Sequence, residues 1–140
     1  MLDQEDLEGA EEHVKEALRI RRLTIGEWSV EVADATTLLA EVYFKQGRLD
    51  DALKMCKLAL RVFRRVHGDG HESVAAAINK VGLALGSKGK LDRAMAKFEE
   101  AHEILVRMYG DDQGDLANVL GNMARVLQEK GEWAESMAME

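Results

Sequence analysis

Two histidines are the residues of this chain that most suggest a chemical site. His67 and His71 lie four residues apart in the stretch HGDGHE, a spacing that two ligands of one metal ion could have. The stretch contains two glycines, which favours a loop, and no further Cys or His lies nearby in the sequence. An ordinary structural role for both histidines is therefore favoured over a metal site.

Cys56, the single cysteine, is a second candidate, as a nucleophile. The chain repeats itself, however, and Cys56 aligns with Val14 and Phe98 in the neighbouring copies, which indicates a buried core position instead. No nucleophile–base pair or pair of catalytic carboxylates stands out, and GDGHE and GDDQGD match neither a Walker loop nor a calcium loop. The sequence predicts a protein that is not an enzyme and that uses no cofactor or metal.

Regularly spaced glycines mark the elements that position these residues. They recur at one constant interval, at Gly26, Gly47, Gly68, Gly89, Gly110 and Gly131. Glycine adopts the left-handed conformation that ends helices without a steric cost, so the spacing predicts alternating helices and turns. The sequences around the glycines alternate as well, so the true period is twice that interval and holds two helices. A period of this length is typical of a solenoid.

Apolar residues follow the same period at helical spacing. The pattern predicts A helices over about 31–46, 73–88 and 115–130, and B helices over about 6–25, 49–67, 91–109 and 133–140. We expect small residues such as Ala59 and Ala101 to be buried where helices approach closely. Ser73 and Asp115 suit the N-cap positions of A helices.

Stacking of these helix pairs predicts an all-α fold, a right-handed solenoid of antiparallel helix hairpins. We expect one domain over residues 1–140, with a leading B helix, repeats at 31–67 and 73–109, and a partial repeat at 115–140. A single hairpin cannot bury its apolar face alone, so neighbouring hairpins must share one core.

Composition narrows the classes of partner. The formal net charge is −7, which argues against nucleic acid and against an anionic membrane surface. No apolar run approaches the roughly 20 residues of a membrane span, and the acidic amino-terminal stretch lacks the apolar core of a signal peptide. One cysteine fits a reducing compartment, so a cytoplasmic location is expected.

The repeated stretches resemble the tetratricopeptide repeat (TPR), in the 42-residue form of kinesin light chains. The family pattern LNNLAxxY followed by QGKYxxA is similar to TTLLAEVYFKQGRLDDA (36–52), INKVGLALGSKGKLDRA (78–94) and LGNMARVLQEKGEWAES (120–136). The stretch GDGHESVA (68–75) is similar to the family linker GxDHPxVA. The chain departs from the pattern in its incomplete asparagine pairs and in having no proline. The resemblance implies a protein–protein interaction scaffold, with cargo or adaptor recognition as in kinesin light chains.

The resemblance also implies that the A helices line a concave groove in which a segment of a partner protein binds. The residues expected there are Thr37, Glu41, Lys45, Asn79, Lys80, Leu83, Asn118, Asn122 and Arg125. Asn79 and Asn122 could hold a peptide backbone, because each amide donates and accepts. Lys80 and Arg125 could pair with acidic side chains that flank the peptide. The carboxylate clamp of chaperone-binding relatives is not expected, since Glu41 would repel a terminal carboxylate, and a solvated face without ligand remains the alternative.

The ends of the array suggest a second function, that of a structural assembly module. Helix 6–25 would lack an A partner, so Leu7, Val14 and Leu18 are expected to stay partly open. The helix over 133–140 is about two turns long, and we expect Trp133 to pack on helix 115–130. The assembly hypothesis predicts self-association through the ends, or a place within a longer repeat array.

Overall fold

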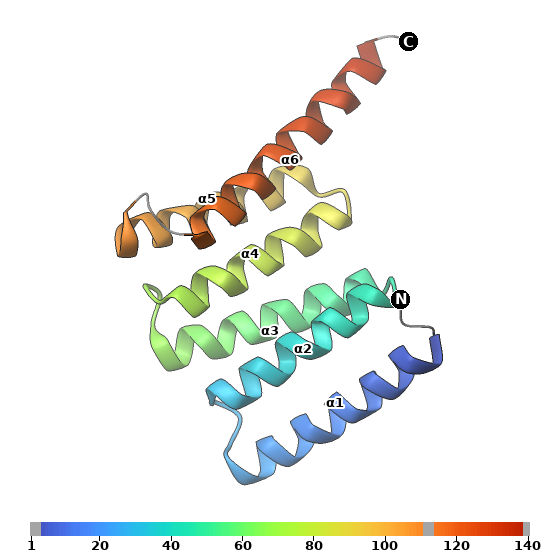
Figure 1. The fold of residues 1–140 in the computed structure, drawn as a ribbon, viewed down its shortest axis with the longest axis vertical. Helices are drawn as coiled ribbons and strands as arrows, with labels where there is room; N and C mark the ends of the chain where they lie inside the picture. Colours follow the sequence, from blue (N-terminus) through green and yellow to red (C-terminus); the bar gives the residue numbers. More distant parts are fainter. Residues whose placement is uncertain (1–3, 111–113, 139–140) are drawn as a thin grey trace.

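In the computed structural model, the structure describes residues 4–110 and 114–138, with side chains for residues 6–110 and 117–132. These residues form only helices, with no strand: α1 (Gln4–Thr24), α2 (Val30–Lys45), α3 (Leu49–His67), α4 (Glu72–Ser87), α5 (Leu91–Tyr109) and α6 (Gly114–Ala138). Figure 1 shows them stacked in chain order from α1 at the bottom to α6 at the top. The expected all-α solenoid is confirmed, with α2, α4 and α6 as A helices and α1, α3 and α5 as B helices.

The A–B turns repeat one hydrogen-bonded geometry. At Gly47, φ is +76°, and the Arg48 amide donates to the Tyr43 carbonyl at 2.9 Å. At Gly89, φ is +81°, and the Lys90 amide donates to the Leu85 carbonyl at 2.9 Å. This is the Schellman ending of a helix, which needs a left-handed residue that glycine supplies without strain. The periodic glycines thus reverse the chain between paired helices, as the sequence predicts.

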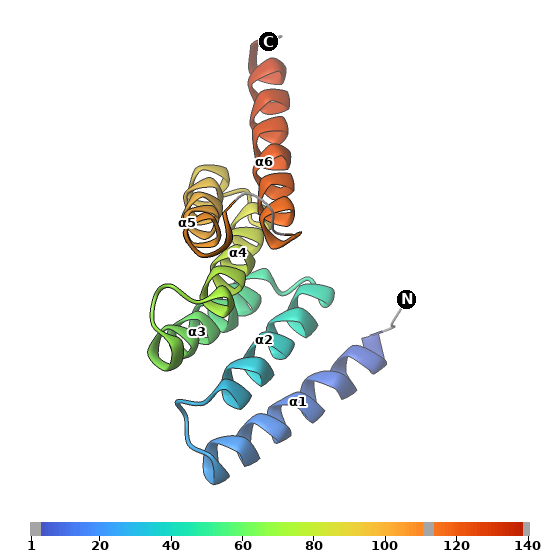
Figure 2. The same ribbon diagram turned by 60° about the vertical axis from the view of Figure 1, so that its left-hand side comes forward.

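The sixth periodic glycine does not end a helix. Gly131 lies inside α6, which runs unbroken to Ala138, and its carboxyl half extends past the other helices (Figures 1 and 2). The separate B helix expected over 133–140 is therefore wrong. A glycine inside a helix costs only about 1 kcal/mol relative to alanine, whereas two turns of helix bury too little surface to hold a chain reversal. The expected packing of Trp133 concerns a side chain that lies outside the described residues.

The core forms between the two layers of helices, and Figure 2 shows α3 and α5 to the left of α2 and α6. Ala59 and Ala101 are both buried in it, as their repeat positions predict. Phe98 fills the space beside Gly82, because a Cβ added to that glycine would lie 2.6 Å from the Cε1 atom of the ring. Close approach of α4 and α5 at this point therefore depends on a position without a side chain.

Two expectations about local contacts are wrong. Leu7, Val14 and Leu18 of α1 are buried rather than open, since α2 covers the face on which they lie. Ser73 is the second residue of α4, and its backbone amide donates to the Nδ1 atom of His71, which is the N-cap. Ser73 could not cap because α4 begins one residue earlier than the pattern suggests. Asp115 lies in the first turn of α6, and its side chain is not described.

Candidate functional site

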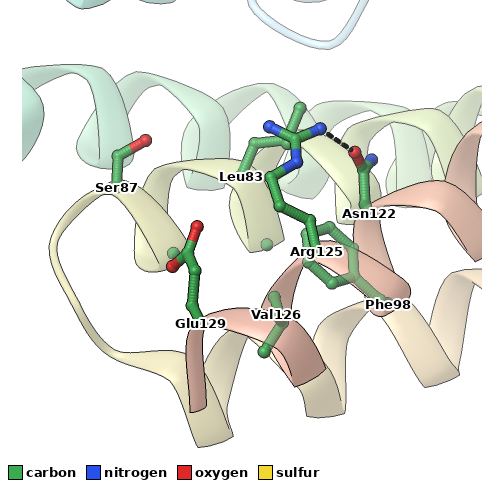
Figure 3. A pocket seen from close by; sticks show the side chains of 9 residues that line it. Leu83, Ser87, Phe98, Asn122, Arg125, Val126 and Glu129 are labelled. Atoms are coloured by element: carbon green, nitrogen blue, oxygen red, sulfur yellow. Dashed lines mark hydrogen bonds between the residues drawn. The ribbon is translucent and has the colours of Figure 1, made fainter. Parts of the chain in front are cut away.

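A chain of polar contacts crosses the three A helices. Lys80 Nζ of α4 lies 3.5 Å from Glu41 Oε1 of α2. On the other side of α4, Asn122 Nδ2 of α6 donates to Asn79 Oδ1 at 3.0 Å. Arg125 donates from its Nη2 atom to Asn122 Oδ1 at 2.8 Å, as the dashed line in Figure 3 shows. The structure thus brings these five predicted residues together across α2, α4 and α6.

Asn79 and Asn122 already form a side-chain hydrogen bond with each other. Asn122 is 8% exposed, with its amide nitrogen on Asn79 and its oxygen on Arg125. Asn79 accepts that bond and keeps both of its own amide hydrogens for other acceptors. Arg125 spends one of its five N–H groups on Asn122. Asn79 and Arg125 therefore keep donors that are available on this surface, while Asn122 positions them.

Two shallow pockets follow the line between α4 and α6, which we call the α4–α6 seam. The larger, of about 170 Å³, is lined by Glu72, Ala75, Ala76, Asn79, Lys80, Leu83, Leu105, Asn118 and Val119. The smaller, of about 90 Å³ and drawn in Figure 3, is lined by Gly82, Leu83, Gly86, Ser87, Phe98, Asn122, Arg125, Val126 and Glu129. Small-molecule sites usually have roughly 300–1,000 Å³, so both pockets suit individual side chains better than a whole ligand.

The remaining predicted residues take different places. Leu83 lines both pockets, and Asn118 lines the larger. Thr37 is half-buried, and its hydroxyl donates to the Ala33 carbonyl of its own helix at 3.0 Å. Lys45 is exposed in the last turn of α2 and lines neither pocket. The seam therefore gathers most of the predicted residues, with Glu41 at its edge, but neither Thr37 nor Lys45.

Phe98 is not indicated for this site by the repeat pattern, because it belongs to a B helix, and yet it lines the smaller pocket. Its ring packs against Gly82 and is 1% exposed, so it contributes to the pocket from within the core. The equivalent positions in the repeats on either side hold Ala40 and Ala124. A glycine at a place where other repeats have alanine was the signal that could have identified this pocket.

The family assignment follows from the sequence of these repeats. The family model described as tetratricopeptide repeat matches residues 31–105, more than half of the chain. The chain belongs to the tetratricopeptide repeat family. No curated protein matches it.

Two solved structures share the fold of this TPR protein. The crystal structure of BtubC (BKLC) from P. vanneervenii has a TM-score of 0.81 and 25% identity, over 94% of this chain and 53% of that one. Kinesin-light-chain-type, nearly identical TPR-like repeats from Podospora anserina have a TM-score of 0.79 and 17% identity, over 93% of this chain and 62% of that one. The TPR protein thus spans little more than half the length of these structures, and the resemblance to kinesin-light-chain-like repeats is confirmed.

Cys56, His67 and His71 were the residues first considered for chemistry. In this TPR protein they have the surroundings of residues with a structural role. Burial raises the pKa of the Cys56 thiol to about 11, which leaves it protonated at neutral pH. The rings of His67 and His71 stack with centroids 3.9 Å apart, and His71 also caps α4. Among the described residues, no three His, Cys, Asp or Glu side chains form a cluster suited to a metal ion. No helix in the described part combines the length and hydropathy of a membrane span.

Proposed function

We propose that this TPR protein is a non-catalytic scaffold that binds a segment of a partner protein along the α4–α6 seam. The TPR fold supports a role in protein–protein interaction in general. The observation that carries the specific proposal is the position of Asn79, which lines the larger pocket, is held by Asn122 of the smaller one, and keeps its amide hydrogens available. By analogy with kinesin light chains, the bound segment would belong to a cargo or an adaptor protein.

The seam favours a peptide with apolar side chains beside acidic ones. Leu83 supplies apolar surface in both pockets, while Lys80 supplies positive charge at the larger pocket and Arg125 at the smaller one. Lys80 is 38% exposed and its contact with Glu41 spans 3.5 Å. Exposed pairs of this kind contribute about 0–1 kcal/mol, so an acidic side chain of the peptide can replace Glu41 at little cost.

Charge reversal on the seam tests the proposal. A peptide selected from a display library on the unmodified protein should bind Lys80→Glu/Arg125→Glu at least about tenfold more weakly, because two attractive contacts become repulsive. Lys45→Glu is the matched control, since that lysine is exposed on an A helix but lines neither pocket. Binding measured by fluorescence anisotropy should also weaken with added salt. Equal affinities for the double variant and the control would place the peptide elsewhere.

A second candidate function, self-assembly, is favoured by one face of α6. Leu120 and Leu127 are 47% and 61% exposed there. Their repeat equivalents in α4, Ile78 and Leu85, are 0% and 2% exposed because α5 covers them. An open apolar face of this kind favours association. Sedimentation velocity over a wide concentration range should show oligomers that Leu127→Glu removes, and a strict monomer would exclude this function for the chain.

We also propose a cytoplasmic location and a partner that is neither nucleic acid nor an anionic membrane. Cys56 is a free, buried thiol, which suits a reducing compartment such as the cytoplasm. The net charge of −7 supports a protein partner rather than nucleic acid or an anionic membrane.

A further inference from the structure

A second hollow lies between α1 and α3, with α2 as its floor, and we call it the α1–α3 groove. It has a volume of about 520 Å³ and is lined by Lys15, Leu18, Arg19, Arg22, Leu23, Leu39, Tyr43, Met55 and Leu58. Leu39 and Tyr43 form a buried apolar floor, whereas Leu23 is 74% exposed on the α1 wall. The groove is distinct from the α4–α6 seam, with which it shares no residue.

Positive charge lines the α1 wall of this groove and is also present on α3 beyond the groove's lining residues. Lys15, Arg19 and Arg22 follow one another on α1 at spacings of four and three residues, so they lie on one side of that helix. On α3, Arg61 and Arg65 continue the face of Leu58 toward the carboxyl end, and their guanidinium carbons lie 5.7 and 4.6 Å from the centre of the Trp28 ring.

Several of these cations have no internal counter-charge. Lys15 and Arg19 pair with Glu11 and Glu16 of their own helix. For Arg22, Arg61 and Arg65, the described residues offer no ion pair at all. A protein of net charge −7 thus concentrates unpaired arginines beside exposed apolar side chains.

The next groove along the array shows that the fold does not require this chemistry. Between α3 and α5, a further hollow is lined by Arg64, Asp69, Gly70, Glu100, Glu103, Ile104 and Arg107. There Arg64 lies 2.7 Å from Glu100, and Arg107 lies 3.3 Å from Glu103. Both arginines are therefore neutralised within the chain.

A shift by one repeat places two lining residues of each hollow at equivalent positions, since Arg64 corresponds to Arg22 and Glu100 corresponds to Leu58. Glu103 corresponds to Arg61, so the carboxylates of Glu100 and Glu103 have no counterpart on α3, whereas Asp69, 3.4 Å from Arg64, corresponds to Glu27. Gly70 corresponds to Trp28, whose ring lies beside Arg61 and Arg65. The hollow between α3 and α5 is thus neutralised within the chain, whereas the α1–α3 groove has unpaired arginines beside apolar side chains.

We propose that the α1–α3 groove binds an amphipathic helix of a partner protein whose apolar stripe is flanked by acidic residues. The apolar floor between two helical walls matches the i, i+3, i+4, i+7 stripe of such a helix. Arg22 on the α1 wall, and Arg61 and Arg65 beyond Leu58 on α3, match carboxylates on both sides of that stripe. Charge complementarity of this kind also disfavours a basic helix, because like charges would then be brought together.

The test uses a fluorescein-labelled helical peptide of about 18 residues, with leucines along one stripe and glutamates on its flanks. The unmodified protein should bind it, and should not bind the same peptide with lysine in place of every glutamate. Trp28 provides a second readout, since Trp133→Phe leaves it as the only tryptophan. Its emission should change when the acidic peptide binds.

Two matched double variants decide where the peptide binds. Arg61→Gln/Arg65→Gln should weaken binding about tenfold, because two charged contacts are lost. Arg93→Gln/Arg107→Gln removes the same charge from exposed positions of α5 and should leave the affinity within about twofold. The seam variant Lys80→Glu/Arg125→Glu should also retain binding, which separates this site from the proposed function. Circular dichroism confirms that each variant is helical.

Three results would overturn the proposal. The acidic peptide could fail to bind, it could bind both arginine-to-glutamine variants equally, or the lysine peptide could bind as well. A fourth result assigns the groove to another occupant and also overturns it. This is self-association of the unmodified chain, seen by sedimentation, that Arg61→Gln/Arg65→Gln abolishes.

Discussion

Replacement of Gly82 by alanine tests how closely α4 and α5 depend on a missing side chain. The added Cβ would lie 2.6, 2.9 and 3.0 Å from the Cε1, Cδ1 and Cζ atoms of Phe98. Such distances are too short for carbon atoms in contact, so the ring or a helix must move. Phe98 is 1% exposed, and a ring packed on all sides has little room to do so.

Two opposing effects set the change in the free energy of unfolding. Overpacking of a well-packed core costs about 1–3 kcal/mol. Alanine in place of glycine inside a helix contributes about 1 kcal/mol of stability in the other direction. Gly82→Ala should therefore lower the free energy of unfolding by about 0–2 kcal/mol.

Gly86 is the matched control, because it lies one helical turn further along α4. A Cβ there would meet only the Cβ atom of Ala94, at an ordinary 3.8 Å. Gly86→Ala should gain the helix propensity without the clash, so the two variants should differ by about 1–3 kcal/mol. Phe98→Leu combined with Gly82→Ala should recover part of the loss, because the shorter side chain makes room.

Urea denaturation followed by circular dichroism at a helical band measures these differences. Repeat proteins can unfold in parts, so the midpoint and slope of all variants should be compared under one set of conditions. If Gly82→Ala were as stable as Gly86→Ala, the close contact between α4 and the Phe98 ring would be incorrect.

Three further predictions concern the core, a helix cap and a buried thiol. Ala101 is 0% exposed, so Ala101→Leu should lower the free energy of unfolding in urea by about 1–3 kcal/mol. A neutral effect would mean that the buried face of α5 is wrongly assigned. His71→Ala should lower it by about 0.5–2 kcal/mol through loss of the cap on the Ser73 amide, whereas His71→Asn should retain most of the stability, and equal losses would argue against capping. Burial raises the pKa of the Cys56 thiol from 9.0 to about 11, so the unfolded chain loses this proton first and stability should fall as the pH rises above 9.0. Cys56→Ala should lack that decline when urea midpoints are compared across pH, and an identical decline in both proteins would exclude the thiol as its cause.

The sequence predicts the fold well because the determinants of the helix pairs are local and repeated. Gly47 and Gly89 reverse the chain through the same backbone bonds, and each lies at the same place in its repeat. Ala59 and Ala101 are buried because each repeat packs its B helix in the same way. One unit therefore serves as the template for the next.

The same reasoning fails where the surroundings of a unit differ from those of its neighbours. Gly131 has the local sequence of a turn, but a turn also needs a following helix with enough buried surface to hold it. Leu7 and Leu18 are expected to stay partly open because helix 6–25 has no A partner of its own, whereas both are buried, Leu18 in a cluster with residues of α2 and α3. Both errors arise because the position of a residue within its repeat does not give the tertiary contacts around it.

The seam residues show a similar division. The period gives their positions on the A helices: Asn79 corresponds to Gly121, so Asn122 lies one residue beyond the equivalent position. Their bonding does not follow from it, since Asn122 donates to Asn79 and accepts from Arg125 rather than remaining available. The distance between side chains on α4 and α6 depends on how closely the helices approach, which residue spacing along one helix cannot give.

Differences between successive repeats also bear on function. A repeat array builds the same hollow more than once, so a residue that only stabilises the fold should recur in each copy. Glu100 and Glu103 of α5 neutralise Arg64 and Arg107, and α3 has Leu58 and Arg61 at the equivalent positions. Because α3 and α5 form the same helix with either set, the difference at Leu58 and Arg61 is available for recognition. Within one chain, the departures from the repeat therefore indicate binding surfaces more directly than the repeat itself.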